Sequence, residues 1–141
     1  MAISQSLDII FDQEQNALIS NVTSLAKSSV IPSIYAYGDT VLNYKIVDGA
    51  VNKDLSSATD FEFKIGKFSA DALLTSSTFS NANASTGEIS VEFDGNVSAL
   101  QTDLDTSVRK NYYAQISCTN NVSNATSMVC SHVLSVGNII S

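Results

Sequence analysis

The sequence predicts an all-β fold, an antiparallel β-sandwich of about seven strands preceded by an N-terminal arm. Apolar and polar residues alternate over 61–66, 89–93 and 112–118. Such alternation places one face of a strand on a core and the other in water. Gly, Asn and Asp cluster between these stretches, which is typical of turns. Two packed sheets joined by polar loops are therefore expected.

The N-terminal part of the chain begins with an expected strand over residues 4–12. Leu7, Ile9 and Phe11 fall on one face of this stretch, and polar residues hold most of the alternate positions. This pattern is typical of a half-buried strand.

The next residues, 13–30, allow two structures. Asp12 and Gln15 could form the capping box of a helix, because apolar residues follow them at helical spacing. In the alternative, the chain turns at 13–16 and returns as a short strand over 17–19. We favour the hairpin, followed by a Ser-rich segment.

The remaining elements follow in order from Pro32, the single proline. Further strands are expected at 41–47, 61–68, 73–79, 88–94, 111–119 and 127–136. A turn over 80–87 and a short helical plug carrying Val97, Leu100 and Leu104 connect them. The expected core consists of Leu42, Tyr44, Ile46, Phe61, Phe63, Ile65, Ile89, Val91, Phe93, Leu100, Ile116, Leu134 and Val136.

The charge of the chain excludes several classes of partner. The 141 residues carry a net charge of −7, with only seven Lys and Arg, whereas nucleic acid and anionic membranes attract clustered basic residues. No stretch approaches the roughly 18 apolar residues of a spanning helix. The first residues lack the basic and apolar regions of a signal peptide, so we expect synthesis in the cytoplasm.

Two cysteines do not make a disulfide framework. If the last hairpin is centred near Asn124, Cys118 and Cys130 fall opposite each other on the apolar side. We favour two buried thiols over a cross-strand disulfide. A metal site is disfavoured, because two thiols and His132 are too few ligands.

No pattern in the sequence predicts an enzyme, and no cofactor is expected. His132, the only histidine, is expected to be a structural, hydrogen-bonded residue, and no G-x-S-x-G motif accompanies it. Asp103 and Asp105 could reach a calcium ion from one loop, as could Asp94 with Asn96. We interpret these as solvated turn residues.

Five tyrosines and no tryptophan give a small indication of contact surfaces. Tyrosine is amphipathic and is favoured at interfaces. Tyr112 and Tyr113 point to opposite faces of their strand, so one of the two should be exposed or covered by a partner.

Several segments together resemble a known family. They are D-L-S-S-A-T-D-F-E-F at 54–63, T-G-E-I-S-V-E-F at 86–93 and Y-Y-A-Q-I at 112–116. The order resembles the small Ig-like β-sandwich domains of tailed-bacteriophage virion proteins, notably the N-terminal domain of siphophage upper-baseplate proteins. Ser57 stands where that pattern usually has Gly. The resemblance covers about residues 38–137 and implies an Ig-like sandwich in a virion, with no catalytic residue.

The resemblance divides the chain into an N-terminal strand or arm, residues 1–37, and an Ig-like sandwich, residues 38–141. It implies a virion structural protein that is made in the bacterial host cytoplasm. Such a protein would associate with copies of itself and dock to other virion proteins, in the baseplate, tail, fibre attachment, neck or head decoration. The arm could donate a strand to a neighbouring subunit. The expected interface residues are Leu7, Ile9, Phe11, Tyr35, Tyr37 and Tyr113.

A second hypothesis is an extracellular adhesin or carbohydrate-binding β-sandwich module. Five N-x-[ST] triplets, the tyrosines and the acidic, Asn-rich loops motivate it. Because no signal peptide is evident, we interpret the triplets as turn composition and prefer the virion hypothesis.

Overall fold

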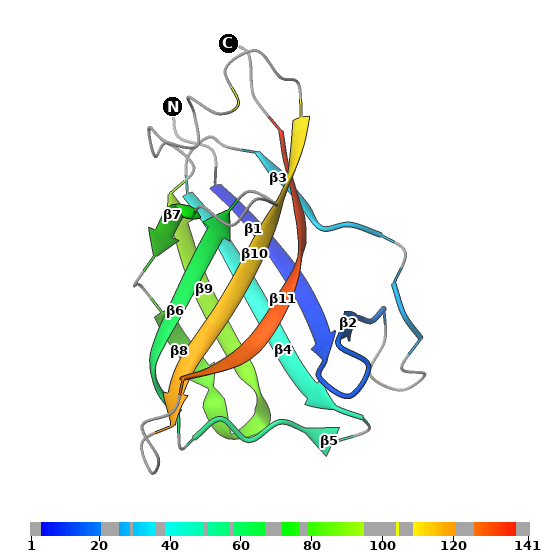
Figure 1. Cartoon of the computed structure of the whole chain (residues 1–141), viewed down its shortest axis with the longest axis vertical. Coiled ribbons are helices and arrows are strands. Elements are labelled where there is room, and N and C mark those ends of the chain that lie inside the picture. The colour runs from blue at the N-terminus through cyan, green and yellow to red at the C-terminus, as the bar shows by residue number, and fades with distance from the viewer. Residues whose placement is uncertain are drawn as a thin grey trace.

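The computed structural model describes residues 4–20, 26–28, 30–35, 39–49, 51–56, 58–66, 72–76, 79–94, 104, 109–120 and 126–137. Figure 1 shows two β-sheets packed face to face. The first sheet has the order β2-β1-β4-β9-β8, with β5 paired to β4, and the second has the order β3-β11-β10-β6-β7. The expected all-β sandwich is confirmed.

The strands of the first sheet are β1 (Ser4–Asp12), β2 (Ala17–Leu18), β4 (Asp39–Asp48), β5 (Val51–Asn52), β8 (Phe79–Asn83) and β9 (Glu88–Asp94). Those of the second sheet are β3 (Ser33–Tyr35), β6 (Ala58–Gly66), β7 (Ala72–Ser76), β10 (Arg109–Asn120) and β11 (Thr126–Gly137). A 3-10 turn, η1 (Ala84–Thr86), precedes β9.

Two pairs of strands are parallel, which the expected antiparallel arrangement did not include. β1 runs parallel to β4 along its whole length, and β3 runs parallel to β11. Parallel neighbours need a crossover connection. The chain makes that crossover by leaving the first sheet after β2, joining the second sheet as β3, and returning as β4.

The core lies between the sheets, where alternate residues of facing strands meet. Its fully buried side chains include Leu42, Ile46, Phe63, Ile65, Ile89, Val91, Ile116, Leu134 and Val136, as the alternation predicted. Phe61 is only partly buried against this core. The side chains of Phe93 and Leu100 lie outside the described part of the chain, as do Val97 and most of the expected helical plug, whereas Leu104 is buried.

The hairpin expected after β1 is confirmed, and the helical alternative is wrong. Phe11 and Asp12 pair with Leu18 and Ala17 across a four-residue turn. Asn16 closes the turn with a φ of 52°, a left-handed conformation that Asn tolerates better than most residues.

The strand expected at 73–79 and the turn expected at 80–87 are both corrected. The chain forms β7 on the edge of the second sheet and then β8 on the edge of the first. Edge strands accept polar residues, so the Ser- and Asn-rich segment 80–83 forms a strand. The turn itself is shorter and ends at Gly87, whose φ of 79° and contact with the Ile46 carbonyl leave no room for a Cβ.

The hairpin of β10 and β11 is shifted from the symmetric one that would place the cysteines opposite each other. Cys118 pairs with Ser127, and Cys130 pairs with Ile116. A bulge inserts one extra residue, Val129, into β11. Both thiols are free and buried, so the cross-strand disulfide is wrong and the buried-thiol alternative is confirmed.

Candidate interaction surfaces

The expected interface residues of the N-terminal segment lie inside this chain's own fold. Ile9 and Phe11 are buried in the core, and Leu7 packs against it from the edge. These side chains reach a neighbouring subunit only if the whole of β1 is exchanged. Strand donation by residues 1–37 stays an untested prediction.

A buried carboxylate fastens β1 to the following turns. Asp12 accepts hydrogen bonds from the Glu14 amide at 3.0 Å, the Gln15 Nε2 at 2.8 Å and the Gly49 amide at 2.9 Å. The bond from Gln15 is the main cause that lowers the pKa of Asp12, and the two amides act in the same direction against desolvation. The residues that suggested a helix cap therefore stabilise a hairpin, and they join it to the turn after β4.

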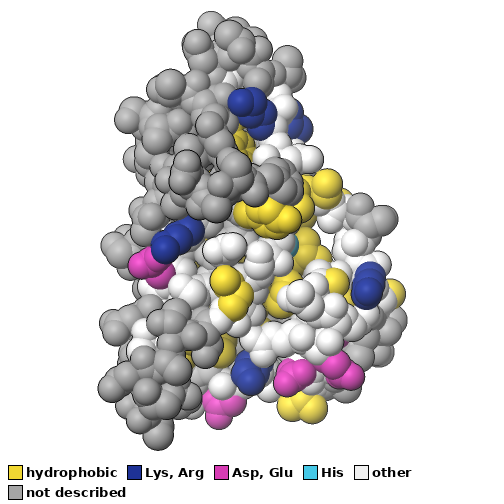
Figure 2. Space-filling view, viewed as in Figure 1, with side chains coloured by type: hydrophobic (Ala, Val, Ile, Leu, Met, Phe, Trp, Pro, Cys, Tyr) yellow, Lys and Arg dark blue, Asp and Glu magenta, His cyan; other side chains and the backbone are white. Residues whose placement is uncertain are grey.

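The outer face of the second sheet carries two tyrosines that lie outside the core. Tyr113 is half-buried and lies opposite Val133, which is also half-buried, whereas Tyr112 is buried in the core. Tyr35 is 46% exposed at the end of the same face. Figure 2 shows hydrophobic side chains gathered across the centre of the face that β10 and β11 present. Tyr37 lies outside the described residues.

Arg109 completes this surface at the end where β3 meets β11. Its guanidinium lies 5.2 Å from the centre of the Tyr35 ring, which is a cation–π distance. It also donates to the Ser135 hydroxyl at 3.0 Å. A Cβ at Gly137 would touch the side chains of Arg109 and Tyr35. We call Tyr35, Arg109, Tyr113 and Val133 together the second-sheet face.

The outer face of the first sheet is a polar network by comparison. The Asn43 amide donates to the Ser6 hydroxyl and to Asp8 Oδ1, both at 3.1 Å, and it accepts from the Ser90 hydroxyl at 2.8 Å. Lys45 donates to the Thr86 carbonyl at 2.9 Å. Polar groups that bond to one another across three strands favour a solvated face over an apolar contact.

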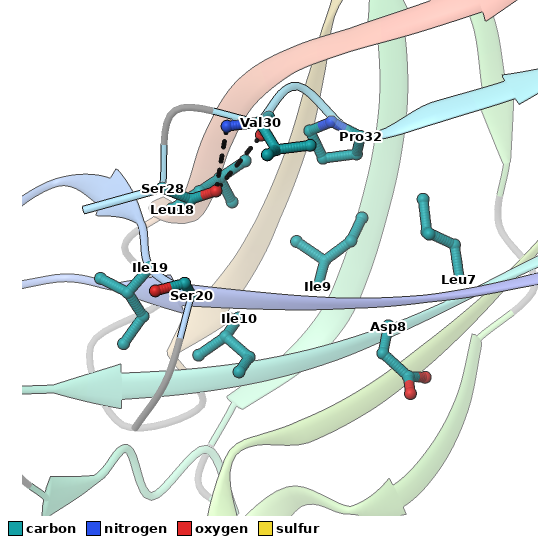
Figure 3. Close-up of a pocket in the computed structure, with 10 residues that line it drawn as sticks. All are labelled: Leu7, Asp8, Ile9, Ile10, Leu18, Ile19, Ser20, Ser28, Val30 and Pro32. Carbon is teal, nitrogen blue, oxygen red and sulfur yellow. Dashed lines mark hydrogen bonds between the residues drawn. The ribbon is translucent and has the colours of Figure 1, made fainter. Parts of the chain in front are cut away.

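An apolar groove opens at the edge of the sandwich, beside β1. Figure 3 shows its walls, with Leu7 and Ile9 pointing toward Val30 and Pro32 while Leu18 closes one end. Its volume is about 230 Å³. Val30 is 74% exposed, although a β-branched side chain of this size is usually buried. We call Leu7, Ile9, Leu18, Val30 and Pro32 the edge groove.

The single histidine is structural, as the sequence indicated. His132 lies in the core, and its Nδ1 is 3.0 Å from the Val133 carbonyl, so this nitrogen carries the proton. The Nε2 then accepts from the Tyr44 hydroxyl at 2.8 Å. Burial is the main cause that lowers the pKa of His132, and it raises that of Tyr44. The pair joins the two sheets, because Tyr44 lies on β4 of the first and His132 on β11 of the second.

The described part of the chain contains neither a metal-binding group of residues nor a membrane-spanning helix. Among its residues, no group of three His, Cys, Asp or Glu is placed to hold a metal ion. Asn96, Asp103 and Asp105 lie outside it, and the Asp94 side chain is not described. No described helix is long and apolar enough to cross a membrane.

Sequence reasoning missed the edge groove and Arg109. Val30 follows a Ser-rich stretch and precedes Pro32, which gave no sign that an apolar residue would stay exposed. Arg109 gave no motif because its contacts, with Tyr35 and Ser135, are far from it in sequence.

Comparisons with known proteins show a similarity of fold but none of sequence. No protein-family model matches the chain, and no curated protein matches it in sequence. Among solved structures, the fold is similar to that of the N-terminal domain of phage TP901-1 ORF48, with a TM-score of 0.53 and 11% sequence identity. The match covers 96% of this chain and 99% of that chain. The resemblance to a phage β-sandwich domain is therefore confirmed at the level of fold.

Proposed function

We propose that this chain is a structural protein of a bacteriophage virion, and that it acts by protein–protein contact without catalysis. The observation that carries the proposal is the match over nearly the whole chain to the fold of a phage protein domain. Because most of both chains take part in the match, it reflects the whole sandwich and not one shared hairpin.

We propose further that the chain associates with copies of itself and docks to other virion proteins through the second-sheet face. The half-buried Tyr113 and Val133 lie side by side there, and the exposed Tyr35 lies further along the same face, opposite Gly137. Tyrosine and arginine are enriched at protein interfaces. The cation–π contact of Tyr35 with Arg109 restricts the movement of this side chain, which reduces the side-chain entropy that binding costs.

Two measurements test the proposal. Mass spectrometry of purified particles from a phage that encodes the chain should find it as a virion component, and its absence would refute the structural role. Native mass spectrometry of the full chain should show a defined oligomer.

A matched pair of variants then locates the contact. Val133→Ser should dissociate the oligomer, because Val133 lies on the second-sheet face. Val41→Ser should not, because Val41 is a similarly half-buried valine on the outer face of the first sheet. Equal effects of the two substitutions would contradict the assignment of the interface.

A further inference from the structure

The edge groove lies next to an open strand edge. The Gln13 amide donates to the Val47 carbonyl of β4, and the Ile10 carbonyl accepts on the other side from the Ile19 amide. Because backbone polar groups alternate in direction along a strand, the even-numbered residues of β1 face away from β4.

This alternation leaves hydrogen-bonding groups at the groove. In the described part of the chain, β2 pairs only with Phe11 and Asp12 of β1. The N–H and C=O groups of Ser6 and Asp8 therefore point toward the edge that β2 does not reach. An edge of this kind can accept a further strand.

The two faces of β1 carry different side chains along this edge. Leu7 and Ile9 point into the groove, and Asp8 and Ile10 point to the opposite side of the strand (Figure 3). A strand added here would send every second side chain into the apolar groove. The side chains between them would lie on the outer side, next to the exposed Asp8 carboxylate.

We propose that this edge binds an extended segment of a different, basic protein chain by strand addition. Backbone hydrogen bonds to Ser6 and Asp8 would supply affinity, and the alternation of apolar and basic residues would supply specificity. Asp8 is the only charged residue among the described residues that line the groove. A basic side chain opposite it would be complementary.

Two other occupants fit the groove less well. Its volume of about 230 Å³ is below the roughly 300–1,000 Å³ of small-molecule pockets. A second copy of this chain has 14 acidic and only seven basic residues, so its charge opposes Asp8. The inference stands whether or not the second-sheet face forms an oligomer.

The test uses the full chain and two synthetic peptides of about six residues, the length that the open part of β1 can pair. One peptide alternates valine with lysine, and the other alternates valine with glutamate. We expect the lysine peptide to bind about tenfold more tightly, a difference of about 1.4 kcal/mol. Amide exchange measured by NMR should slow at Ser6 and Asp8 when this peptide binds.

Variants and a modified peptide separate the contributions of charge and backbone. Asp8→Lys should reverse the preference in favour of the glutamate peptide. Ser6→Pro removes an outward N–H and leaves the backbone bonds to β4 in place, although it also removes the hydroxyl that accepts from Asn43. It should weaken the binding of both peptides. A lysine peptide that is N-methylated at alternate residues tests the same bonds on the unaltered protein, and it should bind weakly.

Three results would overturn the inference. In the first, Asp8→Lys leaves the preference for the lysine peptide unchanged. In the second, the lysine peptide does not slow amide exchange at Ser6 and Asp8. In the third, these amides are already protected without peptide, and the protection disappears when the protein is diluted. The last result would identify a second copy as the occupant. None of them bears on whether the chain is found in phage particles.

Discussion

The hydrogen bond between Tyr44 and His132 gives the sharpest prediction about stability. Tyr44→Phe removes the hydroxyl that donates to His132 Nε2 at 2.8 Å and leaves that buried nitrogen without its partner. Loss of one partner of a buried hydrogen bond costs about 1–3 kcal/mol. We therefore expect the free energy of unfolding, measured with urea at neutral pH, to fall by that amount. Tyr113→Phe, on the half-buried outer face, serves as the control and should change it much less.

The same histidine predicts how stability depends on pH. Its pKa in the folded protein is lowered by burial from the ordinary value of 6.5, so the unfolded chain binds a proton more readily. The stability contribution is fully present above the unfolded pKa, and it is lost as the pH falls toward the folded pKa. One histidine can change the free energy of unfolding by at most about 1.4 kcal/mol per pH unit.

Because His132 is the only histidine, urea unfolding between about pH 7.5 and 5.5 isolates this effect. The wild type should lose stability on acidification over that range, and His132→Leu should lose much less per pH unit. A wild-type stability that does not change with pH, or an equal slope in His132→Leu, would refute the buried neutral state of His132.

Three further predictions concern other parts of the fold. Asp12→Asn should lower the melting temperature, because it weakens the hydrogen bonds from the Gln15 side chain and the Gly49 amide. Acid should have the same effect as the pH falls below the ordinary aspartate pKa of 3.8. Asp54→Asn, in an exposed turn, is the control, and equal shifts of the melting temperature would argue against the role of Asp12. Burial raises the pKa of Cys130 to about 12, so a thiol reagent should label it only after unfolding, and a reducing agent should not shift the melting curve of the native protein. A chelator should also leave the melting curve unchanged, whereas a clear shift would favour the calcium-dependent adhesin hypothesis.

The alternation of apolar and polar residues predicted the core well. Whether a side chain faces inward depends only on the parity of its position, that is, on whether it is an odd or an even residue of the strand. Leu42, Ile46, Ile89 and Val91 face inward in any register that keeps their parity, and each is buried. Parity does not determine which strand is the neighbour. The parallel pairing of β1 with β4, for example, depends on the crossover through the second sheet, and no local pattern encodes it.

Register errors have a similarly physical origin. The position of Cys118 relative to Cys130 depends on the loop between the strands and on the bulge at Val129. Val129 and Cys130 are both buried although they are consecutive, so alternation is interrupted there. A bulge of this kind is stabilised by the packing around it, and the sequence of β11 alone contains no Gly or Pro at that point to indicate it.

The edge groove depends both on which strands are neighbours and on where they pair, because it exists only where a neighbouring strand ends. β2 is two residues long, so it covers the last part of β1 and leaves the rest of that edge to other contacts. The segment that follows carries Val30 and Pro32 across to the second sheet, and these side chains face β1 over a gap instead of pairing with it. Natural sheets usually protect an edge with charge, proline or a covering segment. Here Asp8 supplies the charge, but the apolar wall beside it favours a partner over solvent, and for that reason we expect specific binding at this edge.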